Sequence, residues 1–540
     1  MKYIFVTGGV CSGLGKGIAA ASIGILLKSC GYKICILKLD PYLNVDPGTM
    51  NPYQHGEVFV TDDGTETDLD LGHYERFIDE NLNKLSNTTT GQIYKQIINK
   101  ERKGEFLGKT IQIIPHVTMA IKDTIKKIAI ESHADFLIIE IGGTVGDIEG
   151  EPFLEAARQW HQEQGEKNVL FIHLTLLPFL ETSKELKTKP TQASVRELQR
   201  QGLHPDIILA RSDFPIEKNL IEKISLFCNV LPEEIIPAPT VQNIYEIPLN
   251  FQKFSLVKII SKHLNLKPKT PNLNDWEALI KRIKKQNKKN LTIGIIGKYT
   301  EHEDAYISVK EALKSAGYIN NIDIKIESIA AENLEKQNKK EWAKLKTING
   351  LVVPGGFGSR GIEGKILAVK YARENKIPYL GLCMGMQIAV IEFARNILKM
   401  ADANSTEVNP QTKYPVIYIM PEQIKKMKDK DYGASMRLGA YPCILNKDSL
   451  AYKAYKQKEI SERHRHRYEF NNEYREVCEK AGLKITGTSP DGKLVEIVEL
   501  KNHPWFVGVQ FHPEFKSRPL KSHPLFKDFI FACKKYTATK

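Results

Sequence analysis

The sequence lacks the patterns typical of a secreted or membrane-bound protein. It contains no uninterrupted apolar run long enough to span a bilayer. Its first residues, MKYIFVTGG, lead directly into a predicted strand and a glycine turn, so we expect no signal peptide. The eight cysteines, at positions 11, 30, 35, 228, 383, 443, 478 and 533, form no CxxC pair and no metal-ligand spacing. We therefore expect free thiols, a cytoplasmic protein and no membrane partner.

Acidic residues are fewer than basic ones. The 77 lysines and arginines exceed the 64 aspartates and glutamates, which gives a net charge of +13. The lysines are spread along the chain except for one dense cluster, KRIKKQNKKN at 281–290. A nucleic-acid patch would explain this cluster, but a solvated helix end or linker explains it equally well and is the more common case. We expect no nucleic-acid partner, and a basic surface also suits small polyanionic substrates.

The chain of 540 residues is longer than one hydrophobic core usually serves. We predict a first domain at 1–266, a polar linker at 267–290 and a second domain at 291–540. Each half opens with a β-branched strand, YIFVTGG at 3–9 and LTIGIIGK at 291–298. Short apolar runs then alternate with helix-like segments, which indicates parallel sheets covered on both faces. The predicted fold class is therefore α/β, with two doubly wound parallel-sheet domains.

A glycine-rich turn, GGVCSGLGKG at 8–17, follows the first predicted strand and precedes a helical run. Such a turn exposes backbone N–H groups at a helix N-terminus, and Lys16 can reach between phosphates. Gly17 stands where a phosphate loop normally has the Ser or Thr that binds Mg²⁺, so carboxylates must supply the metal site. Asp70 and Glu140 are the candidates. Asp70 could instead be a loop acid or helix cap, whereas Glu140 ends a buried strand, where ligands bind in α/β sheets.

The segment PYLGLCMGMQ at 378–387 places Cys383 between Gly381 and Gly385, after an apolar strand and before a helix, as in a nucleophile elbow. A base is available in FVGVQFHPEF at 506–515. Because Pro513 disfavours helix, we expect His512 and Glu514 to be an extended i, i+2 pair on one side of the chain, with Glu514 orienting the imidazole that activates Cys383. Alone, such a cysteine is more often core filler and such a histidine structural.

Together with PGGFG at 354–358, this trio resembles class I glutamine amidotransferases, in which a Cys/His/Glu triad hydrolyses glutamine and a glycine turn supplies backbone donors. More motifs extend the resemblance along essentially the whole chain. They are the segment at 38–77, EIGGTVGDIE (140–149), KTKPTQ (187–192), ARSD (210–213), LFCNV (226–230), VPGGFG, GLCMGMQ, RHRHRYEFNN (463–472) and FHPEF. In this order they resemble the CTP synthases, which aminate UTP to CTP with glutamine.

This resemblance implies a function for many positions. For ATP it implies Gly13, Leu14, Gly15, Lys16, Gly17, Ile18, Lys38, Asp70, Pro239, Thr240 and Val241. For UTP or CTP it implies Ser12, Asp147, Ile148, Glu149, Lys187, Thr188, Lys189, Pro190, Thr191, Gln192 and Lys223. For glutamine it implies Gly356, Met384, Gly385, Met386, Gln387, Glu407 and Arg467, and for Mg²⁺ Asp70 and Glu140. It further implies catalysis by Cys383, His512 and Glu514, GTP as an allosteric activator, CTP as a feedback inhibitor and a homotetramer.

Other interpretations are open at this point. KTKPTQ by itself would be an exposed basic turn, and the HRHR cluster would be a solvated basic surface or a nucleic-acid patch. A cobyrinate-type amidoligase also joins a phosphate loop to a glutaminase, but its carboxylate substrate would not need KTKPTQ with Lys223. A nucleotide-sensing scaffold that assembles into filaments belongs to another class. Loss of the Cys/His/Glu trio would favour it, and all three residues are present.

Overall fold

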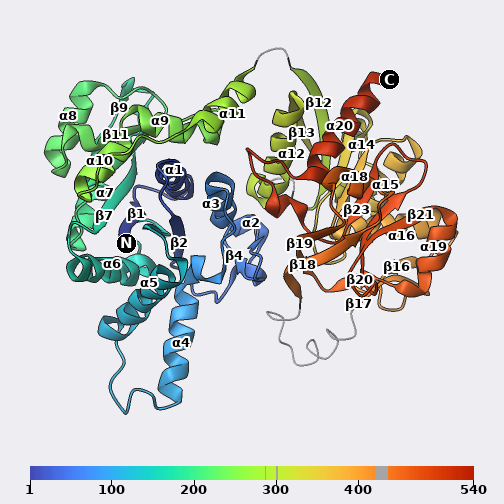
Figure 1. Ribbon diagram of the computed structural model, residues 1–540, viewed down its shortest axis with the longest axis horizontal. Coiled ribbons are helices and arrows are strands. Elements are labelled where there is room, and N and C mark those ends of the chain that lie inside the picture. The colour runs from blue at the N-terminus through green and yellow to red at the C-terminus, as the bar shows by residue number, and fades with distance from the viewer. Residues whose placement is uncertain (286–287, 300–301, 420–435, 540) are drawn as a thin grey trace. The chain divides into compact units, whose positions relative to one another are not determined.

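The computed structural model describes residues 1–285, 288–299, 302–419 and 436–539 (Figure 1). The chain forms two compact units. The first contains Met1–Pro47 and Asp68–Ile280, and the second contains Gly48–Thr67 and Lys281–Lys540. The predicted linker contains helix α11 (Asn274–Lys284), whose Trp276 side chain is buried and donates a hydrogen bond of 2.6 Å to the Tyr245 carbonyl. Among the described residues, no helix combines the length and the apolar character needed to cross a membrane.

The first unit is built on a sheet of seven parallel strands in the order β11-β10-β7-β1-β6-β2-β5. These strands are β1 (Lys2–Gly8), β2 (Ile34–Asp40), β5 (Asn87–Thr89), β6 (Phe136–Ile141), β7 (Val169–Leu176), β10 (Ile207–Ser212) and β11 (Ile235–Pro239). Their continuous apolar sequences are buried on both faces, as expected for a covered parallel sheet. The register places Lys38 of β2 beside Glu140 of β6 near the carboxyl ends of the strands, where ligands bind in such sheets.

Helices cover both faces of this sheet. Helices α1 (Lys16–Ser29) and α3 (Asp70–Ile78) pack together on one face, and α5 (Thr118–Ser132) and α6 (Glu151–Gln164) pack on the other (Figure 1). The remaining elements of this unit are α4 (Thr90–Arg102), α7 (Lys189–Arg200), α8 (Lys218–Cys228), α9 (Ile247–Lys253), α10 (Leu256–His263) and the short pair β8 (Phe179–Leu180) and β9 (Glu185–Leu186).

The second unit contains a nine-stranded sheet in the order β13-β12-β14-β15-β23-β22-β21-β18-β19. The first five are parallel and the rest are antiparallel. The strands are β12 (Lys289–Gly297), β13 (Ile322–Ala330), β14 (Gly350–Val353), β15 (Tyr379–Leu382), β18 (Arg437–Leu445), β19 (Glu459–His466), β21 (Leu483–Thr488), β22 (Val495–Leu500) and β23 (Phe506–Val509). The predicted α/β fold class is thus confirmed. The antiparallel strands β22, β21, β18 and β19 were not predicted, because strands such as EISERHRH are largely polar and do not form continuous apolar runs.

The helices of the second unit are α12 (Ile307–Asn320), α13 (Ala331–Glu335), α14 (Lys339–Thr347), α15 (Ile362–Glu374), α16 (Met384–Asn396), α18 (Leu450–Tyr455), α19 (Arg475–Ala481) and α20 (Pro524–Thr539). A small sheet joins β16 (Ala403–Ser405), β17 (Tyr414–Ile419) and β20 (Tyr468–Phe470). Segment 48–67 adds α2 (Pro52–His55), β3 (Phe59–Val60) and β4 (Glu66–Thr67). Its Phe59 is fully buried with the ring 5.0 Å from that of Phe515, so this segment belongs to the core of the second unit.

Candidate active sites

The glycine-rich loop connects β1 directly to α1. Helix α1 begins at Lys16, and its N-cap residue Gly15 has φ 92°, a left-handed conformation that favours glycine. The Lys16 side chain passes over Gly8, where an added Cβ would lie 2.7 Å from the lysine Cδ. Its amine donates a hydrogen bond of 2.6 Å to the Gly143 carbonyl. The loop therefore presents a helix N-terminus and a lysine on the same side, which is the arrangement that binds phosphates.

Gly17 makes room for Asp70. A Cβ placed on Gly17 would lie 2.0 Å from Asp70 Oδ1 and 2.6 Å from its Cγ. The Asp70 side chain thus occupies the space that a Ser or Thr at position 17 would need. This contact explains in physical terms why the loop departs from the usual phosphate-loop sequence, and it brings a carboxylate to the start of α1.

Lys38 lies among the carboxylates that the sequence suggested for Mg²⁺. Its amine is 2.9 Å from Glu140 Oε1 and forms an ion pair with Asp70, and Tyr74 donates a hydrogen bond to Glu140. Burial raises the pKa of Asp70, but the Lys38 charge more than offsets this and lowers it to about 2. Burial raises the pKa of Glu140, against the opposing effect of Lys38.

These two carboxylates offer the oxygen ligands that Mg²⁺ prefers. The described residues contain no cluster of three or more metal-ligating side chains. Asp70 and Glu140 would therefore supply only part of a coordination shell. This fits Mg²⁺, which commonly keeps waters and substrate phosphate oxygens among its ligands.

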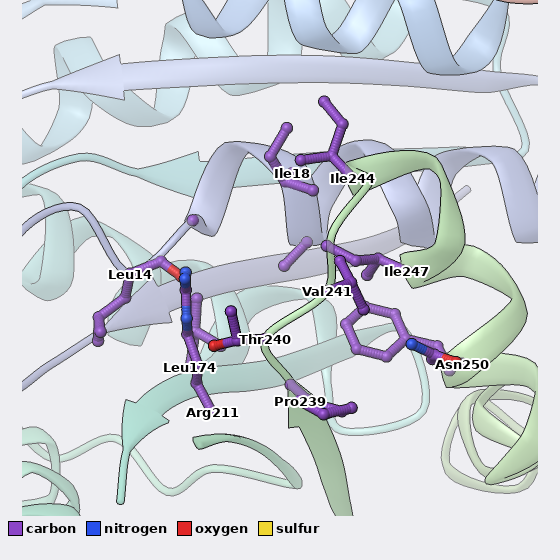
Figure 2. A pocket seen from close by; sticks show the side chains of 14 residues that line it. Leu14, Ile18, Leu174, Arg211, Pro239, Thr240, Val241, Ile244, Ile247 and Asn250 are labelled. Carbon is purple, nitrogen blue, oxygen red and sulfur yellow. The ribbon is translucent and has the colours of Figure 1, made fainter. Parts of the chain in front are cut away.

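A largely apolar pocket opens beside the N-terminus of α1 (Figure 2). It is lined by Leu14, Gly15 and Ile18 and by Pro239, Thr240 and Val241, all predicted from the resemblance. Arg211, Ile244, Ile247, Asn250 and Phe251 also line it and were not predicted. Arg211 belongs to the ARSD motif and donates a hydrogen bond to the Leu14 carbonyl. Ile247, Asn250 and Phe251 lie on α9, and no sequence motif indicated that they line a pocket. The pocket adjoins the phosphate loop, so its apolar walls suit a flat purine ring.

The residues suggested for the pyrimidine nucleotide come from several loops and helices of the first unit. Ser12 follows β1, residues 147–149 follow β6, residues 187–192 lead into and begin α7, and Lys223 lies on α8. Ser12, Lys189, Lys223 and the 147–149 turn are exposed, and Lys187 pairs with Glu185. Ser12 and residues 147–149 thus directly follow strands β1 and β6 of the large sheet, whereas residues 187–192 and Lys223 lie at or within helices α7 and α8.

Part of this group is buried. Gln192 donates a hydrogen bond of 3.1 Å to Thr188, and Thr191 donates one of 3.0 Å to the Leu176 carbonyl. The Gln192 side-chain oxygen has no hydrogen-bond partner in the described part of the chain. A buried amide group of this kind can provide the directional contacts that a pyrimidine base requires.

In the second unit, Cys383 lies between β15 and α16 with φ 51° and ψ −104°. This strained backbone is typical of a nucleophile elbow. The flanking glycines allow very close packing. A Cβ on Gly385 would lie 2.1 Å from the Val353 carbonyl oxygen, and one on Gly381 would lie 2.7 Å from the Gly385 carbonyl carbon. Larger residues at either position would push the turn out of place.

His512 and Glu514 form a buried pair, with His512 Nδ1 2.7 Å from Glu514 Oε1. A Cβ on Gly355 would lie 2.6 Å from His512 Cε1 and 3.6 Å from Cys383 Cβ, so the imidazole and the cysteine meet at this glycine. Burial lowers the pKa of His512, but the neighbouring Glu514 and Cys383 raise it to about 10. The predicted extended i, i+2 geometry is wrong, because Pro513–Lys516 forms a 3₁₀ helix. Proline is tolerated at the first position of a helix, where it gives up no hydrogen bond.

The glycine loop at 354–358 is held by two charged side chains. Lys298 donates hydrogen bonds of 2.7 Å to the carbonyls of Phe357 and Gly358, and Glu407 accepts one of 2.7 Å from the Gly358 N–H. Burial raises the pKa of Glu407, while the Gly358 N–H, Lys298 and Arg467 act in the opposite sense. The predicted glutamine ligands Glu407 and Arg467 therefore lie near each other and beside this loop.

The other predicted glutamine ligands form the start of α16, directly after Cys383. Met384, Gly385, Met386 and Gln387 are all buried. Gln387 donates a hydrogen bond of 3.0 Å to the Tyr468 carbonyl. These residues would act through their backbone or as packing behind the nucleophile.

A cavity beside the His512–Glu514 pair is lined by the glycine loop and by residues of segment 48–67. Arg465 connects the two. It forms an ion pair of 2.7 Å with Glu66, its guanidinium lies 4.9 Å from the Phe357 ring, and its carbonyl is 3.7 Å from Cys383 Sγ. Arg465 and Lys298 were not predicted as site residues. The basic HRHR cluster contains Arg465, but Glu66, with which Arg465 forms its ion pair, lies 399 positions away in the sequence.

Comparisons with known proteins show the family to which the chain belongs. Residues 2–266 match the family model described as CTP synthase N-terminus, and residues 301–532 match that of class-I glutamine amidotransferases. The chain is 56% identical over 532 residues to the CTP synthase of Bacillus velezensis and 57% identical over 531 residues to that of Herpetosiphon aurantiacus, in each case covering 98% of both chains. A solved glutaminase domain of Trypanosoma brucei CTPS with bound acivicin is 40% identical and covers 45% of this chain and 94% of that one, with a TM-score of 0.43.

Proposed function

Because this chain belongs to the CTP synthase family, we propose that its two units carry out the two half-reactions of one enzyme. The protein is a glutamine-hydrolysing, ATP-dependent ligase that converts UTP to CTP, with UTP, ATP and glutamine as its substrates. The C4 oxygen of uracil is a poor leaving group, and ammonia is mostly protonated at neutral pH. The enzyme must therefore activate that oxygen and release ammonia where it can react.

Activation of UTP takes place in the first unit. The O4 atom attacks the γ-phosphorus of ATP, and ADP leaves. Lys16 and Lys38 bind the phosphates, and the apolar pocket in Figure 2 holds the adenine between the 14–18 and 239–241 segments. Asp70 and Glu140 would hold Mg²⁺, which would neutralise charge on the transferred phosphoryl group when bound. The contact between Asp70 and Gly17 supports this assignment, because it brings a carboxylate to the phosphate loop.

The pyrimidine nucleotide binds along the adjoining strand ends. Lys187, Lys189 and Lys223 are the cations for its triphosphate, and Gln192 and Thr188 face its base or sugar with polar groups. Ser12 and residues 190–191 complete the site. Ammonia then displaces phosphate from C4 to give CTP. The exposed turn at 147–149 adds contacts for bound CTP, which acts as a feedback inhibitor because it shares the triphosphate of UTP.

Ammonia is released in the second unit. The Cys383 sulfur, whose proton is held by His512, adds to the side-chain carbonyl carbon of glutamine. The C–N bond breaks, ammonia leaves with that proton, and a γ-glutamyl thioester remains. His512 then takes a proton from water, which attacks the thioester and releases glutamate. Glu514 keeps the imidazole oriented throughout.

Substrate positioning in this unit falls to two charged residues and the glycine loop. Arg467 pairs with the α-carboxylate of glutamine and Glu407 with its α-amino group. The backbone N–H groups of Gly356 and Met384 stabilise the oxyanion. The chain's regulation and assembly follow the family pattern in our proposal: GTP activates glutamine hydrolysis, four copies form the enzyme, and the tetramer works in the cytoplasm. The functional boundaries are 1–266 and 291–540, with segment 48–67 contributing to the second unit.

The observation that carries this proposal best is the buried Cys383, His512 and Glu514 arrangement, supported by the strained backbone of Cys383 and the close approach at Gly355. The test incubates the purified protein with UTP, ATP, Mg²⁺ and glutamine, and then with ammonium chloride in place of glutamine. Chromatography should show CTP in both reactions. Cys383→Ala should retain only the ammonia-dependent one. No CTP from either nitrogen source would refute the proposal, and loss of both in the variant would refute the separation into two sites.

A further inference from the structure

Helix α15 carries a lysine that none of the steps above uses. The Lys365 side chain is fully buried. Its amine lies 3.7 Å from the Met384 sulfur and 3.9 Å from the position that a Cβ on Gly356 would occupy. Met384 follows the nucleophile, and Gly356 belongs to the glycine loop. The amine thus adjoins the two residues whose backbone donors face the reacting carbonyl in the proposed reaction.

This position is unfavourable for a charged group. A thioether sulfur is a weak acceptor, and an ammonium that no carboxylate pairs with is unfavourable in a protein interior. Burial and the nearby Lys298 lower the pKa of Lys365 to about 7, against the opposing effects of Cys383 and Glu407. A methionine of similar length would fill the same space without this cost. Packing alone therefore does not account for a lysine at this position.

The charges around the amine indicate a role in the reaction. Cys383, Glu407 and Lys298 are the charged or titratable groups that act on the amine. Lys298 is bonded to the loop carbonyls, and Glu407 accepts from the Gly358 N–H and is assigned to the α-amino group of glutamine, so both have other partners. Negative charge that appears during the reaction develops on the Cys383 sulfur and on the carbonyl oxygen of the bound glutamine.

We propose that Lys365 is a positioning residue of the glutaminase step, whose protonated amine acts through Met384 and the glycine loop to stabilise the negative charge on the Cys383 sulfur and the oxyanion. This inference rests on the proposed function of Cys383. The amine neither gives up nor takes up a proton during the reaction. Its contribution is present while it is charged and disappears as it loses its proton above neutral pH.

The test compares Lys365→Met with wild type in glutamine hydrolysis between about pH 6 and about pH 9. Below neutrality the wild-type lysine is charged, and kcat of the variant should be about tenfold lower with the KM for glutamine little changed. As the wild-type amine becomes neutral, the ratio of the two rates should fall towards one. Lys370→Met on the same helix is the matched control, because Lys370 is partly exposed, and it should behave as wild type at every pH.

Two measurements separate this role from a structural one. Ammonia-dependent CTP formation by Lys365→Met should equal that of wild type, and its thermal stability should be equal or higher, because a buried charge is replaced by an apolar chain. Lys365→Gln gives a second neutral variant, which should show the same pH-dependent ratio. A rate ratio that is constant with pH, or no loss of rate in either variant, would overturn the inference. Failure of the wild-type protein to hydrolyse glutamine would instead refute the proposed function.

Discussion

Replacing Glu514 by glutamine should separate the role of its charge from that of its shape. The side chain keeps its size and can still bond to His512, but it loses the negative charge 2.7 Å from His512 Nδ1. Both groups are buried, so this charge is poorly screened. A charge-assisted hydrogen bond of this kind contributes roughly 1.5–3 kcal/mol. We therefore expect kcat/KM for glutamine hydrolysis to fall about ten- to a hundredfold.

The same substitution should change how stability depends on pH. His512 has a pKa of about 10 in the folded protein, raised above its usual value of 6.5. A raised pKa stabilises the fold fully below the unfolded value and ceases to do so as the pH rises through the folded value. Removing the Glu514 charge lowers this pKa. The loss of stability in Glu514→Gln should therefore be largest below about pH 6.5 and should decrease to zero towards about pH 10.

A second buried pair in the same unit offers a matched control. His523 Nε2 lies 3.0 Å from Glu462 Oε1, and both side chains are as deeply buried as the catalytic pair. Glu462→Gln should destabilise the protein but leave kcat/KM of the folded fraction unchanged. Steady-state hydrolysis, ammonia-dependent CTP formation and urea denaturation at several pH values provide the measurements. Wild-type hydrolysis by Glu514→Gln, or an equal loss of kcat/KM in both variants, would refute the role given to Glu514.

Three further predictions address the other assignments. Gly17→Ser restores the usual phosphate-loop residue but should displace Asp70, so ammonia-dependent CTP formation should fall about a hundredfold while glutamine hydrolysis is retained. Asp70→Asn should have the same effect. Near-normal synthesis by either variant across a Mg²⁺ titration would contradict the metal assignment. Gly355→Ala should force His512 away from Cys383 and reduce glutamine hydrolysis about a hundredfold while ammonia-dependent synthesis persists, and an active alanine variant would show that the loop can move. Glu149→Gln should raise the CTP inhibition constant about tenfold with little effect on UTP half-saturation, and equal weakening of both nucleotides would place Glu149 in the shared site.

Much of the fold could be predicted because short segments of the sequence specify its parallel strands. The strands of the parallel sheets are short, continuously apolar runs, and the two strand restarts at 3–9 and 291–298 coincide with β1 and β12. The antiparallel strands β18 and β19 carry alternating or polar sequences whose pairing depends on partners elsewhere. Likewise, nothing in the sequence of segment 48–67 indicates that Asp62 and Glu66 pair with Arg463 and Arg465, some 400 residues later.

The candidate sites show the same limit. The residue types at 383, 512 and 514 could be assigned from chemistry and resemblance, and the structure brings them together. The predicted extended geometry of the base is wrong, because Pro513 disfavours a helix only in its interior and here occupies the first helical position. Lys298 and Lys365 carried no signal. A single lysine is indistinguishable from the many others in a basic chain until its burial and its neighbours are known.

One glycine in each candidate site connects a sequence motif with a structural contact. A glycine in a motif indicates that a side chain is forbidden there, but not what forbids it. At position 17 the forbidding group is the carboxylate of Asp70, and at position 355 it is the imidazole of His512. Each glycine thus records the approach of a functional side chain from a distant segment. A larger residue at either position would overlap with that side chain and displace it from the site. The Gly17→Ser and Gly355→Ala substitutions therefore test the proposed chemistry without altering any reactive group.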